Sequence, residues 1–203
     1  MLTFYEGKIN EVDIVTLFCG VCKTNAAIAT QILIDNYHVD VVINAGTAGG
    51  MDDGLDIFDT VISTEVAHHD VHAGILTEFH PWMPSVFFKS DDSLVELSKK
   101  AIKRLCLEHK INYGRMVTGE CFITDDGRDE INAAFKPLTV DMETASIAHT
   151  CFVNEIPFIA IRTITDTASH SGAEHFDKNV VTASEISKKI VLELLNELNG
   201  ENS

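Results

Sequence analysis

Short runs of β-branched and apolar residues alternate with longer amphipathic stretches along the whole chain, and this alternation limits the folds open to it. Strands are predicted at 12–18, 39–44, 59–66, 115–118, 138–142 and 157–163. Helices are predicted at 23–37, from 91 onward, and at 128–135, 143–154 and 184–198. Such alternation is typical of α/β domains. We therefore expect an α/β three-layer sandwich, with helices on both faces of a mixed, largely parallel central sheet.

Composition favours one soluble domain spanning residues 1–203, because no linker, repeat or low-complexity segment interrupts the pattern. The 15 basic and 31 acidic residues give a net charge of −16, which repels phosphate backbones and anionic lipid. We expect neither a nucleic acid nor a membrane as partner. No apolar run approaches the roughly 20 residues of a membrane span, and the first residues do not resemble a signal peptide. Together with five cysteines, this predicts a cytoplasmic protein with reduced thiols.

The first candidate site is the glycine-rich segment NAGTAGG, Asn44 to Gly50, which follows a predicted buried strand. Small-molecule sites in α/β sheets gather at the carboxyl ends of strands. We expect a turn here, whose backbone N–H groups either approach a ligand or simply close a tight connection. The glycine spacing fits neither a dinucleotide fingerprint nor a P-loop.

Carboxylates mark two further strand ends. Asp141 and Glu143 lie where the predicted strand 138–142 gives way to a helix, so they either face a cleft or cap that helix. Asp166 follows the apolar strand PFIAI within the segment RTITD. Partial burial there would raise its pKa and suit it to proton donation, whereas an Asx turn is the alternative.

Three other clusters are candidates on composition alone. The segment 68–72 (HHDVH) is rich in potential metal ligands but lacks the spacing of a helical metal motif, so a loop near a cleft or subunit contact is favoured. Cys19 and Cys22 form a CxxC without a second ligand pair, which favours plain thiols over a redox or zinc site. The acidic residues at 52, 53 and 56 lack the spacing of a calcium loop.

Six segments, taken together and in order, resemble the 5′-methylthioadenosine/S-adenosylhomocysteine nucleosidases of the purine nucleoside phosphorylase superfamily. They are GVCKTNAA, VINAGTAGG, STEVAHHDVHA, TGECFIT, VDMETASIAHTC and PFIAIRTITDTA. The resemblance extends from about Phe4 to Leu198. It implies hydrolysis of the N-glycosidic bond of a 5′-thioadenosine, releasing adenine and a thioribose. It further implies a small-molecule nucleoside substrate, no cofactor, no metal and a homodimer.

The resemblance also implies roles for individual residues. Asp166 matches the acid that protonates adenine N7, and Glu143 matches the carboxylate that holds the ribose hydroxyls near the developing positive charge. The remaining matches are to the base, the sugar, the 5′-thio pocket and the nucleophilic water: Phe122 and Ile123 at adenine, Met142 and Val21 at the sugar, Phe176 at the 5′-thio group, and Thr47 and Arg162 at the water.

The chain departs from the family pattern at three points. Family members open with a strand of the type IGIIGAMxEE, whose glutamate activates the water, whereas this sequence begins at a segment resembling the family's second strand. An exposed sheet edge and an unassigned hydrolytic base are the expected consequences. Cys22 stands where glycine is usual, and Glu120 stands where aspartate is common. A phosphorolytic enzyme and a non-catalytic nucleoside binder are the alternatives to the hydrolase.

Overall fold

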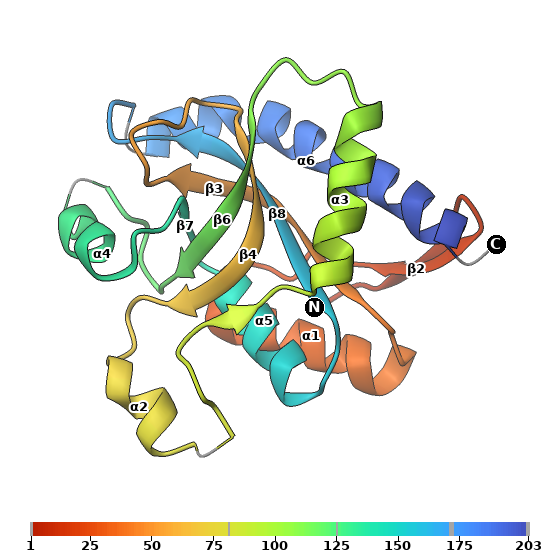
Figure 1. Ribbon diagram of the computed structural model, residues 1–203, viewed down its shortest axis with the longest axis horizontal. Coiled ribbons are helices and arrows are strands. Elements are labelled where there is room, and N and C mark those ends of the chain that lie inside the picture. Colours follow the sequence, from red (N-terminus) through yellow and green to blue (C-terminus); the bar gives the residue numbers. More distant parts are fainter. Residues whose placement is uncertain (1, 81, 125, 171–172, 202–203) are drawn as a thin grey trace.

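The computed structural model describes residues 2–80, 82–124, 126–170 and 173–201. Strands and helices alternate along the chain, as expected (Figure 1). In order, the elements are β1 (Tyr5–Ile9), β2 (Val12–Thr16), α1 (Lys23–Tyr37), β3 (Val42–Gly50), β4 (Thr60–His68), α2 (Ala73–Glu78), β5 (Phe88–Lys89), α3 (Asp92–Arg104), β6 (Ile111–Thr118), α4 (Arg128–Phe135), β7 (Thr139–Asp141), α5 (Thr144–Val153), β8 (Phe158–Asp166) and α6 (Ala173–Glu201).

Six strands form one mixed sheet in the order β5-β4-β6-β7-β3-β8. The two most extensive ladders, β3 with β8 and β4 with β6, are parallel, whereas β3–β7 and β4–β5 are antiparallel. The predicted mixed, largely parallel sheet is thereby confirmed. An antiparallel pairing also joins β8, at one end of the strand row, to β4, the second strand from the other end. The sheet is therefore curled toward a barrel, which the alternation of elements did not predict.

Helices cover the sheet on two sides (Figure 1). α6 packs on β3 and β8 and against α3, whereas α5 packs on β4 and β6 and against α1. β4 and β7 are buried over most or all of their length, and every residue of β8 is buried. This burial explains why their sequences read as continuous apolar runs rather than as alternating patterns.

Two predicted elements are corrected by the structure. The segment NAGTAGG is not a turn, because Asn44 to Gly50 continue β3. Its glycines serve close approach instead: a Cβ at Gly46 would collide with the Arg162 guanidinium, and one at Gly49 would lie 3.1 Å from Asp166 Oδ2. The last helix begins at Ala173 rather than 184 and runs to Glu201.

Of the two strands of the first hairpin, only the second was predicted. β1 and β2 pair antiparallel, with Ile9 opposite Val12. The two turn residues, Asn10 and Glu11, both have positive φ, 49° and 64°. That pair of conformations matches a type I′ hairpin turn, although the sequence lacks the glycine that usually signals one.

One edge of β3 is open over most of its length. β3 pairs with β8 from Val42 to Gly49, but with β7 only at Gly49 and Gly50. Within the described residues, the β1–β2 hairpin forms a sheet of its own and adds no strand to this edge. The expected exposed sheet edge therefore lies on β3. No helix in the described part of the chain is long and apolar enough to cross a membrane.

Candidate active site

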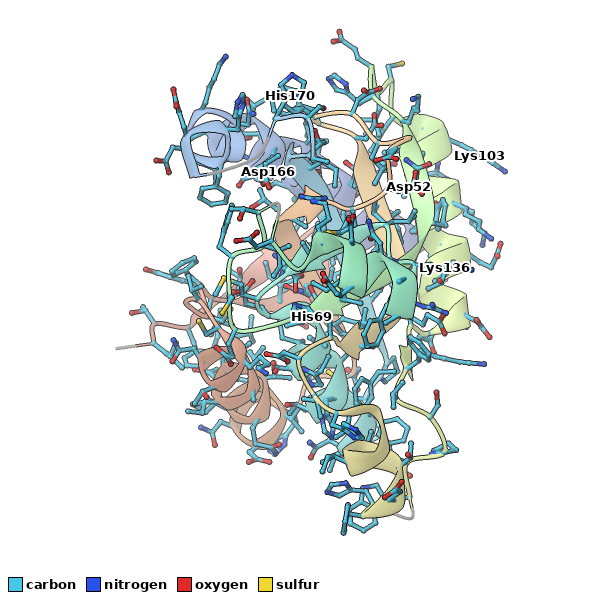
Figure 2. All side chains as sticks on the ribbon, turned by 90° about the vertical axis from the view of Figure 1, so that its left-hand side faces the viewer. Asp52, His69, Lys103, Lys136, Asp166 and His170 are labelled. Carbon is cyan, nitrogen blue, oxygen red and sulfur yellow. The ribbon has the colours of Figure 1, made fainter. Side chains whose placement is uncertain are left out.

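The register of the sheet brings the carboxyl ends of several strands together. Asp166, the last residue of β8, lies opposite Gly49, and Gly49 also lies opposite Val140 of β7. Asp141, the last residue of β7, lies opposite Thr118, the last residue of β6. Figure 2 looks onto this side of the molecule, with Asp166 labelled. The strand ends that carry the candidate carboxylates thus form one continuous row.

Asp141 is committed to hydrogen bonds within the protein. Its carboxylate accepts from Thr118 Oγ1 at 2.6 Å and from the backbone N–H groups of Glu143 and Thr144 at 3.2 and 3.1 Å. It also pairs with Arg162 Nε at 2.9 Å. These bonds satisfy N–H groups at the start of α5, so the capping interpretation holds for Asp141.

Glu143 has a different environment, although it lies only two residues away. Its Oε1 accepts from the backbone N–H of Cys22 at 3.0 Å, and its Oε2 lies 3.3 Å from Arg162 Nη2. The side chain is 14% exposed. Burial raises the pKa of Glu143, and the Arg162 charge partly opposes that rise. A carboxylate in this position keeps oxygen lone pairs free for a ligand while staying anchored at both oxygens.

Arg162 lies beneath both carboxylates and is 5% exposed. Besides Asp141 and Glu143, its guanidinium donates to the carbonyl oxygen of Thr47 at 3.3 Å. The absence of a side chain at Gly46 makes room for this group. The guanidinium is therefore bound by groups of the protein on several sides, and Thr47 joins the site through its backbone.

Asp166 is 2% exposed, and the ion pairs of Arg162 found in the described part of the chain are with Asp141 and Glu143 instead. Its Oδ1 accepts from Thr165 Oγ1 at 2.8 Å. Burial raises the pKa of Asp166, and the Thr165 hydrogen bond and the charge of Arg128 partly oppose the rise. A carboxyl group with a raised pKa holds its proton to higher pH and is suited to donate it.

Two aromatic residues, Phe122 and Phe176, flank these carboxylates in the sequence and form a pair in the structure. The rings of Phe122 and Phe176 meet edge to face, with centroids 6.1 Å apart and an interplanar angle of 84°. Phe122 is 43% exposed, so one of its ring faces is accessible. Ile123 packs on the apolar cluster that includes Val140. The structure thus brings together two aromatic residues that lie more than 50 positions apart in the chain.

Two residues predicted at the sugar, Val21 and Met142, are less directly connected to the candidate site. Val21 is 52% exposed, and its carbonyl accepts from Asn25 Nδ2 at 2.9 Å. It is placed near the carboxylates only through its neighbour Cys22. Met142 is half-buried between Asp141 and Glu143.

Two polar side chains that were not predicted at the site, Thr144 and Asn44, complete the hydrogen bonding. Thr144 Oγ1 accepts from Asn44 Nδ2 at 2.8 Å and from Arg162 Nε at 3.0 Å, and donates to Asp141. Asn44 is buried within β3. A polar side chain inside an apolar strand needs a partner, and that pattern could have indicated its role. The backbone amide of Cys22 carried no such signal.

The histidine, cysteine and acidic clusters that composition singled out have structural environments. Among the described residues, no group of three or more His, Cys, Asp or Glu side chains is placed to hold a metal ion. His68 packs edge-on against Phe88 and beside His149, and burial with the His149 charge lowers the pKa of His68 to about 4. Asp52 accepts from the Gly54 N–H at 2.8 Å, as a turn residue does. All five cysteines are free.

Two cavities flank the sheet. The smaller, of about 240 Å³, is lined by the last residue of β3 and by residues that follow β3 and β8, including Met51 and Thr167, and Asp166 is not among the lining residues. The larger, of about 770 Å³, lies between α5 and the segment around Trp82 and Asp91, away from the carboxylates. The chemistry-bearing residues are therefore not in the larger cavity.

Comparison with known proteins agrees with this geometry. The phosphorylase superfamily matches residues 2–196. A 5′-methylthioadenosine/S-adenosylhomocysteine nucleosidase of Exiguobacterium sp. is 39% identical over 194 residues, covering 93% of this chain and 82% of that protein.

Solved structures extend the likeness to the whole fold. The corresponding nucleosidase of Colwellia psychrerythraea, in complex with adenine, has a TM-score of 0.88 and 35% identity, covering 97% of this chain and 83% of that one. That of Neisseria meningitidis, in complex with methylthio-immucillin-A, has a TM-score of 0.87 and 36% identity, covering 96% of this chain and 85% of that one. The chain therefore belongs to the phosphorylase superfamily and, within it, to the family of the 5′-methylthioadenosine/S-adenosylhomocysteine nucleosidases.

Proposed function

We propose that this protein hydrolyses the N-glycosidic bond of 5′-methylthioadenosine and S-adenosylhomocysteine, releasing adenine and a thioribose. One observation carries the proposal. Two buried or partly buried carboxyl groups with raised pKa lie on the two strands that flank β3 in a chain of this family: Glu143 just after β7, and Asp166 at the end of β8. Two such groups can act on opposite parts of a nucleoside, one on the base and one on the sugar.

In the proposed reaction Asp166 is the acid. Adenine leaves poorly as an anion, so a proton delivered to N7 lowers the barrier to bond cleavage. Burial favours the protonated carboxyl of Asp166. As the proton moves to N7, the bond between the base and the sugar breaks and its electrons stay with adenine.

Glu143 acts on the sugar in this proposal. Its carboxylate holds the ribose hydroxyls and stabilises the positive charge that develops as the sugar becomes oxocarbenium-like. The Cys22 amide and Arg162 fix its two oxygens, which supports a fixed orientation. Water then adds to the sugar carbon and loses a proton to the solvent, and the solvent returns a proton to Asp166. Thr47 and Arg162 are the groups proposed beside that water, with no residue assigned as its base.

The remaining contacts follow the family resemblance. The accessible ring of Phe122 stacks on adenine, and the backbone of Ile123 meets the edge of the base. Phe176 lines the 5′-thio pocket, which the edge-to-face contact with Phe122 supports. Val21 and Met142 pack on the sugar.

Water is favoured over phosphate as the nucleophile. A phosphorolytic enzyme needs cationic groups free to bind the phosphate dianion. The guanidinium of Arg162, which lies below the proposed nucleophile position, is paired with Asp141 and Glu143. These pairs already offset its charge, which argues against a phosphate site there.

The test is the release of adenine from 5′-methylthioadenosine, first in phosphate-free buffer and then with added phosphate. Hydrolysis predicts release without phosphate. A rate that requires phosphate would support a phosphorylase, and tight nucleoside binding without release would support a binder. Glu143→Gln should lower turnover at least about 100-fold with the fold retained. The matched control is Glu130→Gln on the exposed surface of α4, which should leave turnover unchanged.

We further propose a homodimer, whose partner covers an exposed apolar surface. Five large apolar side chains are exposed on α2, on the following segment and at the end of α5: Ile75, Phe79, Trp82, Phe152 and Val153. Three of them line the 770 Å³ cavity. An apolar patch of this kind is typical of a protein interface. Sedimentation velocity should give a dimer, and Phe152→Asp should shift it toward the monomer.

A cytoplasmic location completes the proposal. All five cysteines are free thiols, including the exposed Cys106 and Cys121. Free exposed thiols persist in reducing compartments. Fractionation of the native cells, with the protein followed by antibody, tests the location.

A further inference from the structure

Three charged side chains that the proposed reaction does not use meet beside the candidate site. Lys23 is the first residue of α1, Asp70 follows β4 and Glu120 follows β6. Lys23 Nζ donates to both oxygens of Asp70, at 2.9 and 2.8 Å. The backbone N–H of Glu120 donates to Asp70 Oδ2 at 3.0 Å, and that of Lys23 donates to Glu120 Oε1 at 3.2 Å. We call these three residues the Lys23 latch.

The latch is adjacent in sequence to two groups of the site. Cys22, whose amide donates to Glu143 Oε1, immediately precedes Lys23. Phe122, the accessible ring, lies two residues after Glu120. Lys23 is therefore one residue away from the amide that holds Glu143, and Glu120 is two residues away from the ring proposed to stack on adenine.

The segment 17–22 depends on the latch for its position. Within the described residues, no backbone-to-backbone hydrogen bond joins this segment to the sheet. Cys22 is bonded to Glu143, and the next ties are those of Lys23 to Asp70 and Glu120. By contrast, β4 and β6 are already held together by their ladder. What the latch adds is therefore the placement of segment 17–22 against the ends of these two strands.

The latch differs from an ordinary surface ion pair in geometry and burial. Its Lys23 and Asp70 side chains are only 21% and 28% exposed. Burial raises the pKa of Asp70, but the bonds from Lys23 and from the Glu120 amide outweigh this effect and hold that pKa below the usual range of an aspartate. Asp70 is accordingly ionised at neutral pH, and its bonds are charge-assisted.

We propose that Lys23, Asp70 and Glu120 act as positioning residues that hold the Cys22 amide against Glu143 and orient the loop bearing Phe122. This inference rests on the proposed function for its effect on turnover. Small displacements of groups that position a substrate have large kinetic effects, because the reacting atoms must be aligned before reaction.

Lys23→Met tests the latch because methionine keeps most of the side-chain length and removes the charge and the donor. We expect kcat/KM for 5′-methylthioadenosine to fall about ten-fold or more, with KM rising and kcat falling, since both Glu143 and Phe122 lose their orientation. Lys23→Arg keeps the charge and should restore most of the loss. The control is Lys8→Met, which breaks the exposed Lys8–Asp13 pair of the hairpin and should change neither constant.

Amide hydrogen exchange gives a second measurement that needs no turnover. In Lys23→Met, exchange should accelerate in segments 17–23 and 119–124 and stay unchanged in β3 and β8. Uniform acceleration, or no change in either segment, would overturn the proposal, as would kcat/KM within two-fold of the parent enzyme. If the parent protein releases no adenine, the proposed function fails, and the exchange pattern alone decides whether the latch positions the segment.

Discussion

Replacing Asp141 by asparagine should destabilise the protein strongly, because it breaks a buried ion pair and keeps the shape of the side chain. The Asp141 carboxylate is 4% exposed and faces Arg162 Nε at 2.9 Å. An asparagine oxygen can still accept from Thr118, but its NH₂ group then lies toward a guanidinium that is itself a donor. Removing one partner of a buried pair costs about 3–5 kcal/mol, because the other charge stays buried.

Arg162 has a second partner, and this places the expected loss at the lower end of that range. Glu143 Oε2 lies 3.3 Å from Arg162 Nη2 and still offsets its charge in the variant. We therefore expect the free energy of unfolding to fall by about 3 kcal/mol. With a urea m-value of about 2 kcal/mol/M, the midpoint should move down by about 1.5 M.

Equilibrium unfolding in urea, followed by far-ultraviolet circular dichroism, measures this shift. The matched control is Asp13→Asn, which removes the acidic partner of the exposed Lys8–Asp13 pair and should leave the midpoint unchanged. A loss below about 1 kcal/mol for Asp141→Asn would refute the reasoning, because it would mean that the buried pair contributes no more than a surface pair.

Three further predictions concern strain and ionisation. Cys22 has φ 77° and ψ 162°, a region that glycine occupies freely. Cys22→Gly should therefore raise the free energy of unfolding by about 1 kcal/mol, after subtraction of the extra entropy that glycine gives the unfolded chain. A higher thermal midpoint would show this gain. Because the reaction needs protonated Asp166, kcat/KM should fall as pH rises through its raised pKa, and a flat profile would contradict that role. The raised pKa values of Glu143 and Asp166 mean that the folded state binds more protons than the unfolded chain. Stability should therefore decline as pH rises from about 4 through the folded values, and Asp166→Asn should flatten part of that decline in urea titrations at several pH values.

The elements that the sequence predicted best are those with a strong local signal. α1 and α4 begin and end at the predicted residues, 23–37 and 128–135. The buried strands were recognised as apolar runs, but their ends were misplaced. β3 continues through NAGTAGG because its glycines admit Arg162 and the Asp166 carboxylate, a tertiary reason that no local pattern contains. The pairing of β4 with β8 has the same origin, since it depends on the twist of the whole sheet.

The sequence predicted which carboxylates belong to the candidate site, but it did not predict the role of each one. Position at strand ends selected Asp141, Glu143 and Asp166 together. Spacing alone could not assign capping to Asp141, because that assignment depends on the Thr118 hydroxyl and the Arg162 guanidinium from other strands. The backbone N–H groups that bind these carboxylates were not predicted, because the sequence does not show which amide faces a carboxylate.

The distribution of one buried positive charge explains how neighbouring carboxyl groups can differ in ionisation. Arg162 contacts Asp141 and Glu143, and its charge opposes the rise in the pKa of Glu143. Among the described residues no ion pair joins Asp166 to that guanidinium, and burial is the main influence on the pKa of Asp166. A site that must hold an anionic group near a developing cation and a protonated acid near a leaving base needs this asymmetry. The fold supplies it by directing Arg162 from the middle of β8 toward β7, while Asp166 ends β8 beside the glycines of β3.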